Sequence, residues 1–274
     1  MEYVYLGYGK FDAATNMAID EATLKRVDED RRVFIRFYDF ERPTVILAKR
    51  ESIEDVNLEK CTEMGFDVNR RLSHGSVILC DDTTISYSIV SPSHDPSSAH
   101  KEFSRKIAMA LKELGVENVG IGEHFSVRID GKTVAGHGQR YRWMHGLLYH
   151  GVMAVHPWNT ELINDVIKLR PSPGDGKKDE YQLVRELPSV NDYVRASKNE
   201  VAAKILDSIT GGNYNLMDIS ELYPDVQHFK ETKYANHSWV YNAHQAHETP
   251  PIISKDQGFC FIDIIAPEGT VEMV

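Results

Sequence analysis

Residues 69–82 read Asn69-Arg70-Arg71-Leu72-Ser73-His74-Gly75-Ser76-Val77-Ile78-Leu79-Cys80-Asp81-Asp82. Two arginines end an expected strand, a turn of small residues follows, and a second apolar strand leads to two acids. Backbone N–H groups in such a turn can approach an anion because no bulky Cβ stands in the way. Arg71 adds a guanidinium that can clamp a phosphate or carboxylate. The stretch predicts either an anion-binding hairpin or an ordinary hairpin with a surface arginine pair.

A second informative stretch covers residues 129–140 and reads Ile129-Asp130-Gly131-Lys132-Thr133-Val134-Ala135-Gly136-His137-Gly138-Gln139-Arg140. Asp130-Gly131 is a strong hairpin signal, and Lys132 opens the strand that follows it. A tight turn holds the lysine backbone rigidly and directs its ammonium group. The small residues at 135–138 leave room for a ligand against the backbone. The alternative is a solvated turn lysine, which most turn lysines are.

Outward from these two stretches, the chain reads as a mixture of strands and helices. Strands are expected at residues 3–7, 33–38, 44–48, 66–70, 76–79, 84–90, 125–129, 132–134 and 147–155, and helices at 12–27, 54–64, 103–114, 160–169, 197–209 and 224–239. Strict βα alternation is not sustained, which argues against a doubly wound parallel sheet. The pattern predicts an α+β fold of mixed, mostly antiparallel sheets flanked by helices.

The end of the chain reads differently from the rest. Residues 242–251 have two prolines and no periodicity, and residues 258–265 and 270–274 read as two strands. We therefore expect a main domain over residues 1–241 and a C-terminal extension over 242–274 with a β-hairpin. The hairpin is interpreted as a remnant of an accessory domain, a docking strand or a strand pair packed on the core.

Composition restricts the class of protein. The net charge of −10 and the pI near 5.6 argue against non-specific nucleic-acid binding and against docking on anionic membranes. The N-terminus has no secretory pattern, and no apolar run has the length of a membrane span. The cysteines Cys61, Cys80 and Cys260 stand far apart, without zinc-ligand spacing. These features predict a cytoplasmic protein with free thiols.

Together, the two stretches resemble the lipoate–protein ligase family, within the wider group of biotin/lipoate ligases and octanoyltransferases. That family carries Arg-Arg-x-[Ser/Thr]-Gly-Gly-Gly-Ala-Val-x-His-Asp, later Gly-x-Lys-[Ile/Val]-x-Gly-Ser-Ala-Gln-Arg, and then a strand with His-Gly. The last pair is His150-Gly151 here, and residues 16–21, 36–38 and 234–239 match further family segments. The resemblance covers about residues 3–240 and implies a biotin/lipoate ligase-like catalytic domain over residues 1–241.

Several residues depart from the family pattern. The glycine triplet is His74-Gly75-Ser76, the histidine before Asp81 is Cys80, and the Ser-Ala pair before Gln139 is His137-Gly138. Octanoyltransferases of the group use a nucleophilic cysteine at one of two places, which correspond here to residues 124–125 and 169–172. Neither place holds a cysteine, which favours an ATP-dependent ligase. No family role maps to Cys80.

The resemblance implies a two-step ligase for lipoate or a related medium-chain fatty acid. ATP, with Mg²⁺, would convert the acid to an acyl-adenylate, and a lysine of a lipoyl-domain carrier protein would then take the acyl group. Lys132 is implied as the catalytic residue, bridging the α-phosphate and the acyl carboxylate. The implied substrate- and nucleotide-binding residues are Arg71, Ser73, His74, Gly75, Ser76, Val77, Ile78, Leu79, Lys132, Ala135, Gly136 and His150. Asp81 is the candidate ligand for Mg²⁺.

The implied carrier is of the glycine-cleavage H protein type or the 2-oxoacid dehydrogenase E2 type, and a separate accessory ligase domain is a further implied partner. Three alternatives remain. One is an ATP-independent octanoyl or lipoyl acyltransferase. Another is a non-catalytic ligase-like protein that binds lipoate or a nucleotide. Biotin ligation is the third, and the Gly-Arg-Gly-Arg loop of biotin enzymes is absent from the sequence.

Overall fold

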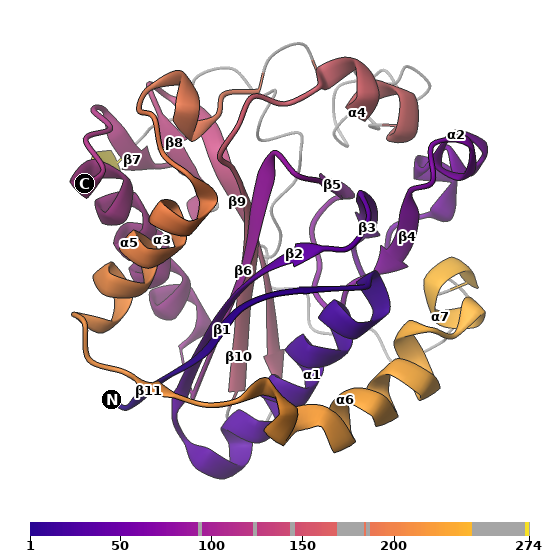
Figure 1. The fold of residues 1–274 in the computed structure, drawn as a ribbon, viewed down its shortest axis with the longest axis horizontal. Coiled ribbons are helices and arrows are strands. Elements are labelled where there is room, and N and C mark those ends of the chain that lie inside the picture. Colours follow the sequence, from indigo (N-terminus) through magenta and orange to yellow (C-terminus); the bar gives the residue numbers. More distant parts are fainter. Residues whose placement is uncertain are drawn as a thin grey trace.

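The computed structural model describes residues 1–92, 95–122, 125–142, 146–168, 184, 187–242 and 272–273. These residues build one large and one small β-sheet with helices packed on both (Figure 1). The large sheet runs in the order β11 (Asn215–Leu216), β1 (Tyr3–Phe11), β2 (Val33–Phe40), β6 (Thr84–Pro92), β10 (Gly146–Ala154), β9 (Lys132–Arg142), β8 (Val127–Ile129), β7 (Val119–Ile121) and β12 (Glu272–Met273). The small sheet runs in the order β4 (Asp67–Arg70), β3 (Thr44–Leu47) and β5 (Ile78–Cys80).

Most neighbouring strands are antiparallel, and the parallel pairs are β1 with β2, β1 with β11, and β3 with β4. The expected α+β fold with mostly antiparallel sheets is therefore confirmed. The helices are α1 (Ala13–Asp30), α2 (Leu58–Glu63), α3 (Pro96–Glu113), α4 (Thr160–Val166), α5 (Lys198–Thr210), α6 (Tyr223–Phe229) and α7 (His237–Asn242). Short helical turns lie at Ile53–Asp55, Val190–Asp192, Ile219–Leu222 and Lys230–Tyr234. None of the described helices is both long and apolar enough to cross a bilayer.

The large sheet is covered on both faces, as Figure 1 shows: α3 and α5 pack on one face, and α1 and α6 pack on the other. Strand β6 shows how the sequence directs this arrangement. Ile85, Tyr87 and Ile89 enter the core under α3 and α5, as their alternation predicts. The intervening Ser86 and Ser88 are also buried, because α1 covers their face.

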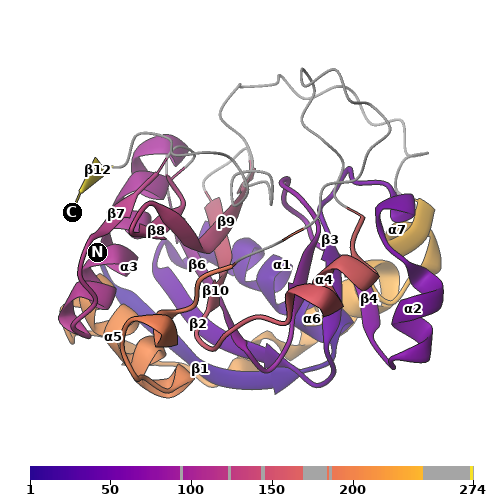
Figure 2. The same ribbon diagram turned by 90° about the horizontal axis from the view of Figure 1, so that it is seen from above.

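The small sheet sits at the opposite end of the molecule from β7 and α3, beside α2 and α7 (Figure 2). Its outer side packs on α4 through a third core cluster that includes Val45, Leu79 and Ile163. Its strand β4 is held by the late part of the chain. Asn69 Nδ2 donates to the carbonyl of Tyr234 at 3.0 Å, and Arg70 Nε donates to the carbonyl of Trp239 at 3.1 Å.

Capping residues set the helix ends. Asp12 accepts from the backbone N–H of Thr15 at the start of α1, and a Ser197–Glu200 capping box opens α5. Helix α3 begins at Pro96, within residues 92–98 that read as a loop and before Phe103, the first residue of its apolar stripe, because Asp95 caps it. The single helix predicted over 224–239 is instead α6, a π-helical turn over Lys230–Tyr234, and α7.

The C-terminal extension is described only at Glu272–Met273, where β12 pairs with β7 at Ile121 and Gly120. The predicted strand at 258–265 lies outside the described residues. The division of the chain at residue 241 stays a prediction.

Candidate functional site

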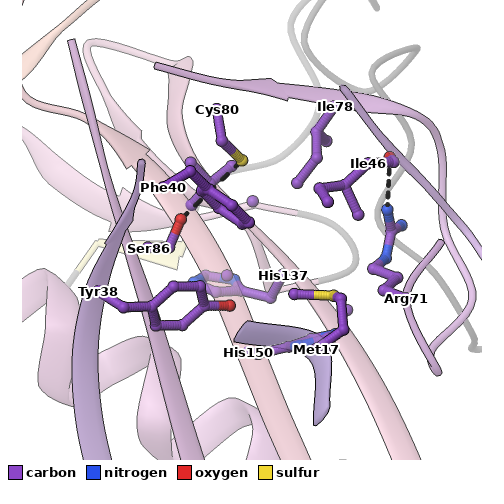
Figure 3. Close-up of a pocket in the computed structure, with 14 residues that line it drawn as sticks. Met17, Tyr38, Phe40, Ile46, Arg71, Ile78, Cys80, Ser86, His137 and His150 are labelled. Carbon is purple, nitrogen blue, oxygen red and sulfur yellow. Dashed lines mark hydrogen bonds between the residues drawn. The ribbon is translucent and has the colours of Figure 1, made fainter. Parts of the chain in front are cut away.

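A pocket with about 410 Å³ of empty space, part of it open to solvent, lies between α1, the small sheet and the middle of the large sheet (Figure 3). Its walls come from Met17, Tyr38, Phe40, Ile46, Arg71, Ile78, Cys80, Ser86, Gly136, His137, Gly138, His150, Gly151 and Val152. Most of the side chains on this wall are apolar or aromatic. Such a pocket suits an apolar chain that carries one polar end.

Arg71 supplies the cation of the pocket. The residue is buried, and protein atoms orient its guanidinium: Nη1 donates to the carbonyl of Ile46 at 3.3 Å (Figure 3). Nη2 donates to the carbonyl of His74 at 3.1 Å. Its Nε donates to Ser73 Oγ at 3.0 Å. Arg70 is buried as well, so the alternative of a surface arginine pair is wrong.

Asp20, His150 and Ser73 form a hydrogen-bonded triad at the pocket. His150 Nδ1 lies 2.8 Å from Asp20 Oδ2, and His150 Nε2 lies 2.6 Å from Ser73 Oγ. All three residues are buried. The triad joins α1, β10 and the turn after β4, three segments that are far apart in sequence.

Asp20 also pairs with Arg36 on β2, whose Nη2 lies 2.6 Å from Asp20 Oδ1. Burial opposes ionisation of this carboxyl, but Arg36 and His150 outweigh it and hold the pKa of Asp20 below its usual value. The carboxylate is therefore charged at neutral pH, and it favours a proton on the imidazole nitrogen that faces it.

Two glycines let strands and side chains approach closely at the pocket wall. A Cβ at Gly138 would lie 2.6 Å from Ser73 Oγ and 3.2 Å from His150 Nε2. A Cβ at Gly151 would lie 2.6 Å from the carbonyl oxygen of Gly136. Neither position has room for a side chain in this arrangement.

Cys80 lines the pocket beside Ser86, but its thiol is not poised for attack. Burial raises the pKa of Cys80 to about 12, so the thiol stays protonated at neutral pH. The nearest hydrogen-bond partner is Ser86 Oγ, at 3.9 Å from the sulfur.

Comparison with known families decides where this fold and pocket belong. The lipoyl protein ligase A/B catalytic domain matches residues 12–210. The chain belongs to the lipoyl protein ligase A/B family. The match includes both β4–β5, with Arg71, and β9–β10, with Gly138 and His150.

Relatives within the lipoyl protein ligase A/B family carry two kinds of activity. The chain is 31% identical over 131 residues to lipoate–protein ligase LplJ of Bacillus subtilis, covering 47% of this chain and 38% of that protein. It is 24% identical over 271 residues to lipoate–protein ligase 1 of Staphylococcus aureus, covering 95% of this chain and 80% of that protein. It is also 31% identical over 121 residues to octanoyltransferase LipM of Carboxydothermus hydrogenoformans, covering 41% of this chain and 45% of that protein.

Solved structures share the fold. A putative lipoate protein ligase from T. acidophilum with bound lipoic acid aligns with a TM-score of 0.75 at 19% identity, over 88% of this chain and 99% of that one. A lipoate-protein ligase A bound with ATP aligns with a TM-score of 0.75 at 19% identity, over 89% of this chain and 99% of that one.

The structure does not bring Lys132 to this family's pocket. Lys132 pairs with Ile129 across the hairpin, and Ile129 belongs to the core under α3 and α5. The exposed Lys132 side chain therefore lies on the face of the sheet opposite the pocket. Its charge acts on Tyr193. Burial and then Asp130 raise the pKa of this tyrosine above its usual value, and Lys132 offsets part of that rise. This placement fits the alternative of a solvated turn lysine.

A β-bulge is the physical reason for this orientation. Val127 pairs with Ala135 and Arg128 with Thr133, so Val134 is an extra residue in β9. Strict alternation from Gly136 would have put residue 132 on the pocket face. The extra residue shifts the alternation by one, so Thr133 takes that face.

The family pattern itself agrees with this register. Counted back from Val134-Ala135-Gly136, its lysine falls at position 133, one residue after Lys132. Thr133 holds that position and is 4% exposed, and its Oγ1 has no hydrogen-bond partner within the described part of the chain. Lys132 is thus one residue out of place for the catalytic role expected from the motif.

The other expected site residues divide into two groups. Arg71, Ile78, Gly136 and His150 line the pocket, and Ser73 lies directly behind its wall. Outside the lining are His74, Gly75, Ser76, Val77, Leu79 and Ala135. Of these, His74 acts through its carbonyl, which orients Arg71, and Ala135 faces the core under α3 and α5.

Asp81, the expected ligand for Mg²⁺, is partly occupied by its own turn. Its Oδ1 accepts hydrogen bonds from the backbone N–H and the hydroxyl of Thr83. Across the described residues, no group of three or more His, Cys, Asp or Glu side chains could hold a metal ion.

Sequence reasoning assigned no role to Asp20, Tyr38, Phe40 or Gly138. A signal was present for the first two, because residues 16–21 and 36–38 both match family segments. Gly138 was expected only as part of the small stretch 135–138 that leaves room for a ligand and as a departure from the family pattern, and its closeness to Ser73 became visible only in the structure.

Proposed function

We propose that this chain transfers a lipoyl group, or a related medium-chain acyl group, to a lysine of a lipoyl-domain carrier protein. The observation that carries the proposal is an apolar pocket with the buried guanidinium of Arg71 in its wall. The apolar walls would desolvate the chain, at about 0.8 kcal/mol per buried methylene. The guanidinium would hold the carboxylate or carbonyl end.

The relatives support this acyl class, since lipoate–protein ligases and octanoyltransferases both handle chains of this kind. One similar solved structure is described as a bipartite lipoate protein ligase and its E2 lipoyl domain. That description supports a carrier of the E2 type, beside the H protein type. It also supports a separate accessory ligase domain as a partner.

The first candidate route for activation is ATP-dependent. The acyl carboxylate would attack the α-phosphorus of ATP, expel pyrophosphate and form an acyl-adenylate, which the carrier amine would then open. Arg71 would offset the repulsion between two anions. Mg²⁺ would neutralise the ATP phosphates, but Asp81 alone, engaged with Thr83, fits a protein-held ion poorly. We therefore assign no step to that residue.

The second candidate route transfers the acyl group from a thioester without ATP. Position 133 favours it, because threonine stands there in place of the lysine of the family pattern. Lys132, on the opposite face, does not substitute for that lysine. A chain without this ammonium has less to bring an acyl carboxylate and a triphosphate together.

A lipoyl domain can be used as the acceptor to test the function and to separate the routes. One reaction holds lipoate or octanoate with ATP and Mg²⁺, and the other holds octanoyl-acyl carrier protein without ATP. Intact-mass measurement of the lipoyl domain reports acyl transfer. We expect a gain of one acyl group in at least one reaction. Binding of lipoate by calorimetry with no gain in either reaction would indicate a non-catalytic binding protein instead.

The role of Arg71 has a matched control. Arg71→Gln removes the buried cation, and we expect acyl transfer to fall by on the order of 100-fold, as for loss of a charge-stabilising donor. Arg42→Gln removes an arginine whose side chain is 69% exposed and pairs with Asp67 at the surface. Equal activity in the two variants would contradict a role for Arg71.

A further inference from the structure

The Asp20–His150–Ser73 triad has the order of groups that activates a serine in acyl-transfer enzymes: carboxylate, imidazole, hydroxyl. The two links measure 2.8 Å and 2.6 Å. Such triads recur on unrelated folds and are recognised by geometry and by the role of each group. The proposed function above gives these three residues no chemical step, although their hydrogen bonds already place them in this order.

The hydrogen-bond directions fix the protons. The Asp20 carboxylate can only accept, so His150 Nδ1 carries a proton and donates to Asp20 Oδ2. In the neutral imidazole, Nε2 is then the acceptor for the Ser73 hydroxyl. This is the tautomer in which an imidazole can take a proton from a serine. Ser73 Oγ also accepts from Arg71 Nε. The donor from Arg71 also favours the serine oxygen as it gains negative charge.

Gly138 lets strand β9 pack directly against the hydroxyl. Ser73 is buried, but its Oγ is hydrogen-bonded to two residues that line the pocket, Arg71 and His150. A Cβ at position 138 would stand 2.6 Å from Oγ and 3.2 Å from His150 Nε2. A side chain there would therefore displace the serine or the histidine from the triad.

Two departures from the family pattern fall on strand β9. The pattern has alanine where this chain has Gly138, and lysine where it has Thr133. Position 133 thus lacks the ammonium that adenylation would use, and Gly138 leaves the Ser73–His150 hydrogen bond undisturbed. The thiol of Cys80, the other nucleophile on the pocket wall, has a pKa of about 12 because of burial.

We propose that Ser73 is a catalytic nucleophile that takes the acyl group from a thioester as a serine ester, with His150 as general base and Asp20 as a positioning residue. The inference rests on the proposed function, by its ATP-independent route. Ser73 Oγ forms a bond to the thioester carbonyl carbon while its proton passes to His150 Nε2. The carbon–sulfur bond then breaks, and the departing thiolate takes that proton from His150.

The second step returns the enzyme to its starting state. The neutral ε-amine of a carrier lysine attacks the ester carbonyl and gives up one proton to His150 Nε2. The bond between the carbonyl carbon and Ser73 Oγ breaks, and the serine recovers its proton from His150. The products are an amide on the carrier and a free hydroxyl, without net oxidation or reduction.

Covalent capture tests the inference. Full-length protein is mixed with octanoyl-acyl carrier protein, quenched in acid and measured by intact mass and peptide mapping, with a lipoyl domain added in a second series. We expect one octanoyl group on Ser73, which the lipoyl domain then removes. The ester is expected to be absent in Ser73→Ala and to form about 10²–10⁴-fold more slowly in His150→Gln. Ser104→Ala is the matched control, because this buried serine lies on α3 and bonds Tyr149 on the opposite face.

Three further variants separate chemistry from folding. Ser73→Cys keeps a nucleophile in place and is expected to collect a thioester that neutral hydroxylamine cleaves. Gly138→Ala leaves the triad residues present and is expected to block the ester. Asp20→Asn is expected to change the pH profile of ester formation, whereas a purely structural loss would lower the rate by one factor at every pH.

Several results would overturn the inference. Acyl transfer to the lipoyl domain that is as fast in Ser73→Ala as in the wild type would leave the proposed function standing and remove the nucleophile. An octanoyl group mapped to Cys80 would do the same. If no acyl group is transferred either with ATP or with a thioester donor, the proposed function itself fails and the triad has no transferase to serve.

Discussion

The two faces of the large sheet each bury a histidine, and the two histidines are treated in opposite ways. His150 on β10 and His137 on β9 are neighbours in the ladder, since His150 pairs with Gly138 and Gly151 pairs with His137. The pleat sends His150 to the pocket face, where Asp20 and Ser73 bond both ring nitrogens. His137 faces the core, where its ring stacks on Tyr149 with centroids 4.7 Å apart.

The difference shows how one residue type acquires two chemistries within a single pair of strands. Neither ring nitrogen of His137 has a hydrogen-bond partner among the described residues. Burial, and then the nearby His100, hold the pKa of His137 well below its ordinary value. His137 therefore acts as an aromatic core residue, whereas His150 is held in a network that can move a proton.

Removing Asp20, which anchors Arg36 and His150 on the pocket face, should have the largest effect on the free energy of unfolding. Asp20→Ala leaves Arg36 buried without its carboxylate, which lies 2.6 Å away in the native protein. We expect a loss of about 3–5 kcal/mol in the free energy of unfolding, measured by urea denaturation. Glu63→Ala is the control, because the Lys60–Glu63 pair is exposed and its loss should cost less than about 1 kcal/mol. Similar losses in both variants would show that the buried network does not anchor the fold.

His137 on the core face should make the free energy of unfolding depend on pH. The folded protein keeps His137 neutral, while the unfolded chain takes up a proton below about pH 6.5. The contribution of His137 to the free energy of unfolding is therefore fully present above that pH. As the pH falls below it, this residue lowers the free energy of unfolding by up to about 1.4 kcal/mol per pH unit. We expect wild type to lose up to about 2 kcal/mol between pH 6.5 and pH 5 through His137.

A variant sharpens that prediction. His137→Phe keeps a ring against Tyr149 and removes the titrating group, so its stability should fall less between pH 6.5 and pH 5 in urea denaturation at each pH. If the variant and wild type lose stability in parallel, the ring of His137 is not the group that takes up the proton on unfolding.

The smallest effect is expected at Lys132. Its exposed side chain lies on the core face beside Tyr193, away from the pocket. We expect Lys132→Ala to change the free energy of unfolding by no more than about 0.5 kcal/mol and to leave acyl transfer unchanged, measured by the mass of the lipoyl domain. Thr133→Lys is its counterpart and should raise ATP-dependent pyrophosphate release, because it places an ammonium on the pocket face. A collapse of transfer in Lys132→Ala would mean that the lysine reaches the pocket during catalysis.

The sequence was sufficient for local features of the fold. The alternation at Ile85, Tyr87 and Ile89, the Asp130-Gly131 turn and the Ser197–Glu200 capping box all produced the structure that they predict. Each of these signals depends on residues only a few positions apart, so a linear reading captures it.

Long-range features were not predictable in this way. Asp20 and His150 are 130 residues apart, and no local pattern states that their side chains meet. The bulge at Val134 adds a single residue to β9 and so reverses the side of the sheet to which the preceding residues of the strand point. As a result Lys132 lies on the face opposite the pocket and not on the face that its expected role requires. The π-helical turn at Lys230–Tyr234 likewise interrupts the single helix that was predicted over residues 224–239.

The clamp of β4 by Tyr234 and Trp239 has a consequence for the order of events at the ribosome. The strand that leads into Arg71 emerges early, but the carbonyls that hold Asn69 and Arg70 emerge some 165 residues later, as their sequence separations of 165 and 169 show. Strand β4 therefore cannot complete its hydrogen bonds in the nascent polypeptide until α7 has been synthesised. The cavity that Arg71 lines should therefore be complete only after α7 has left the ribosome.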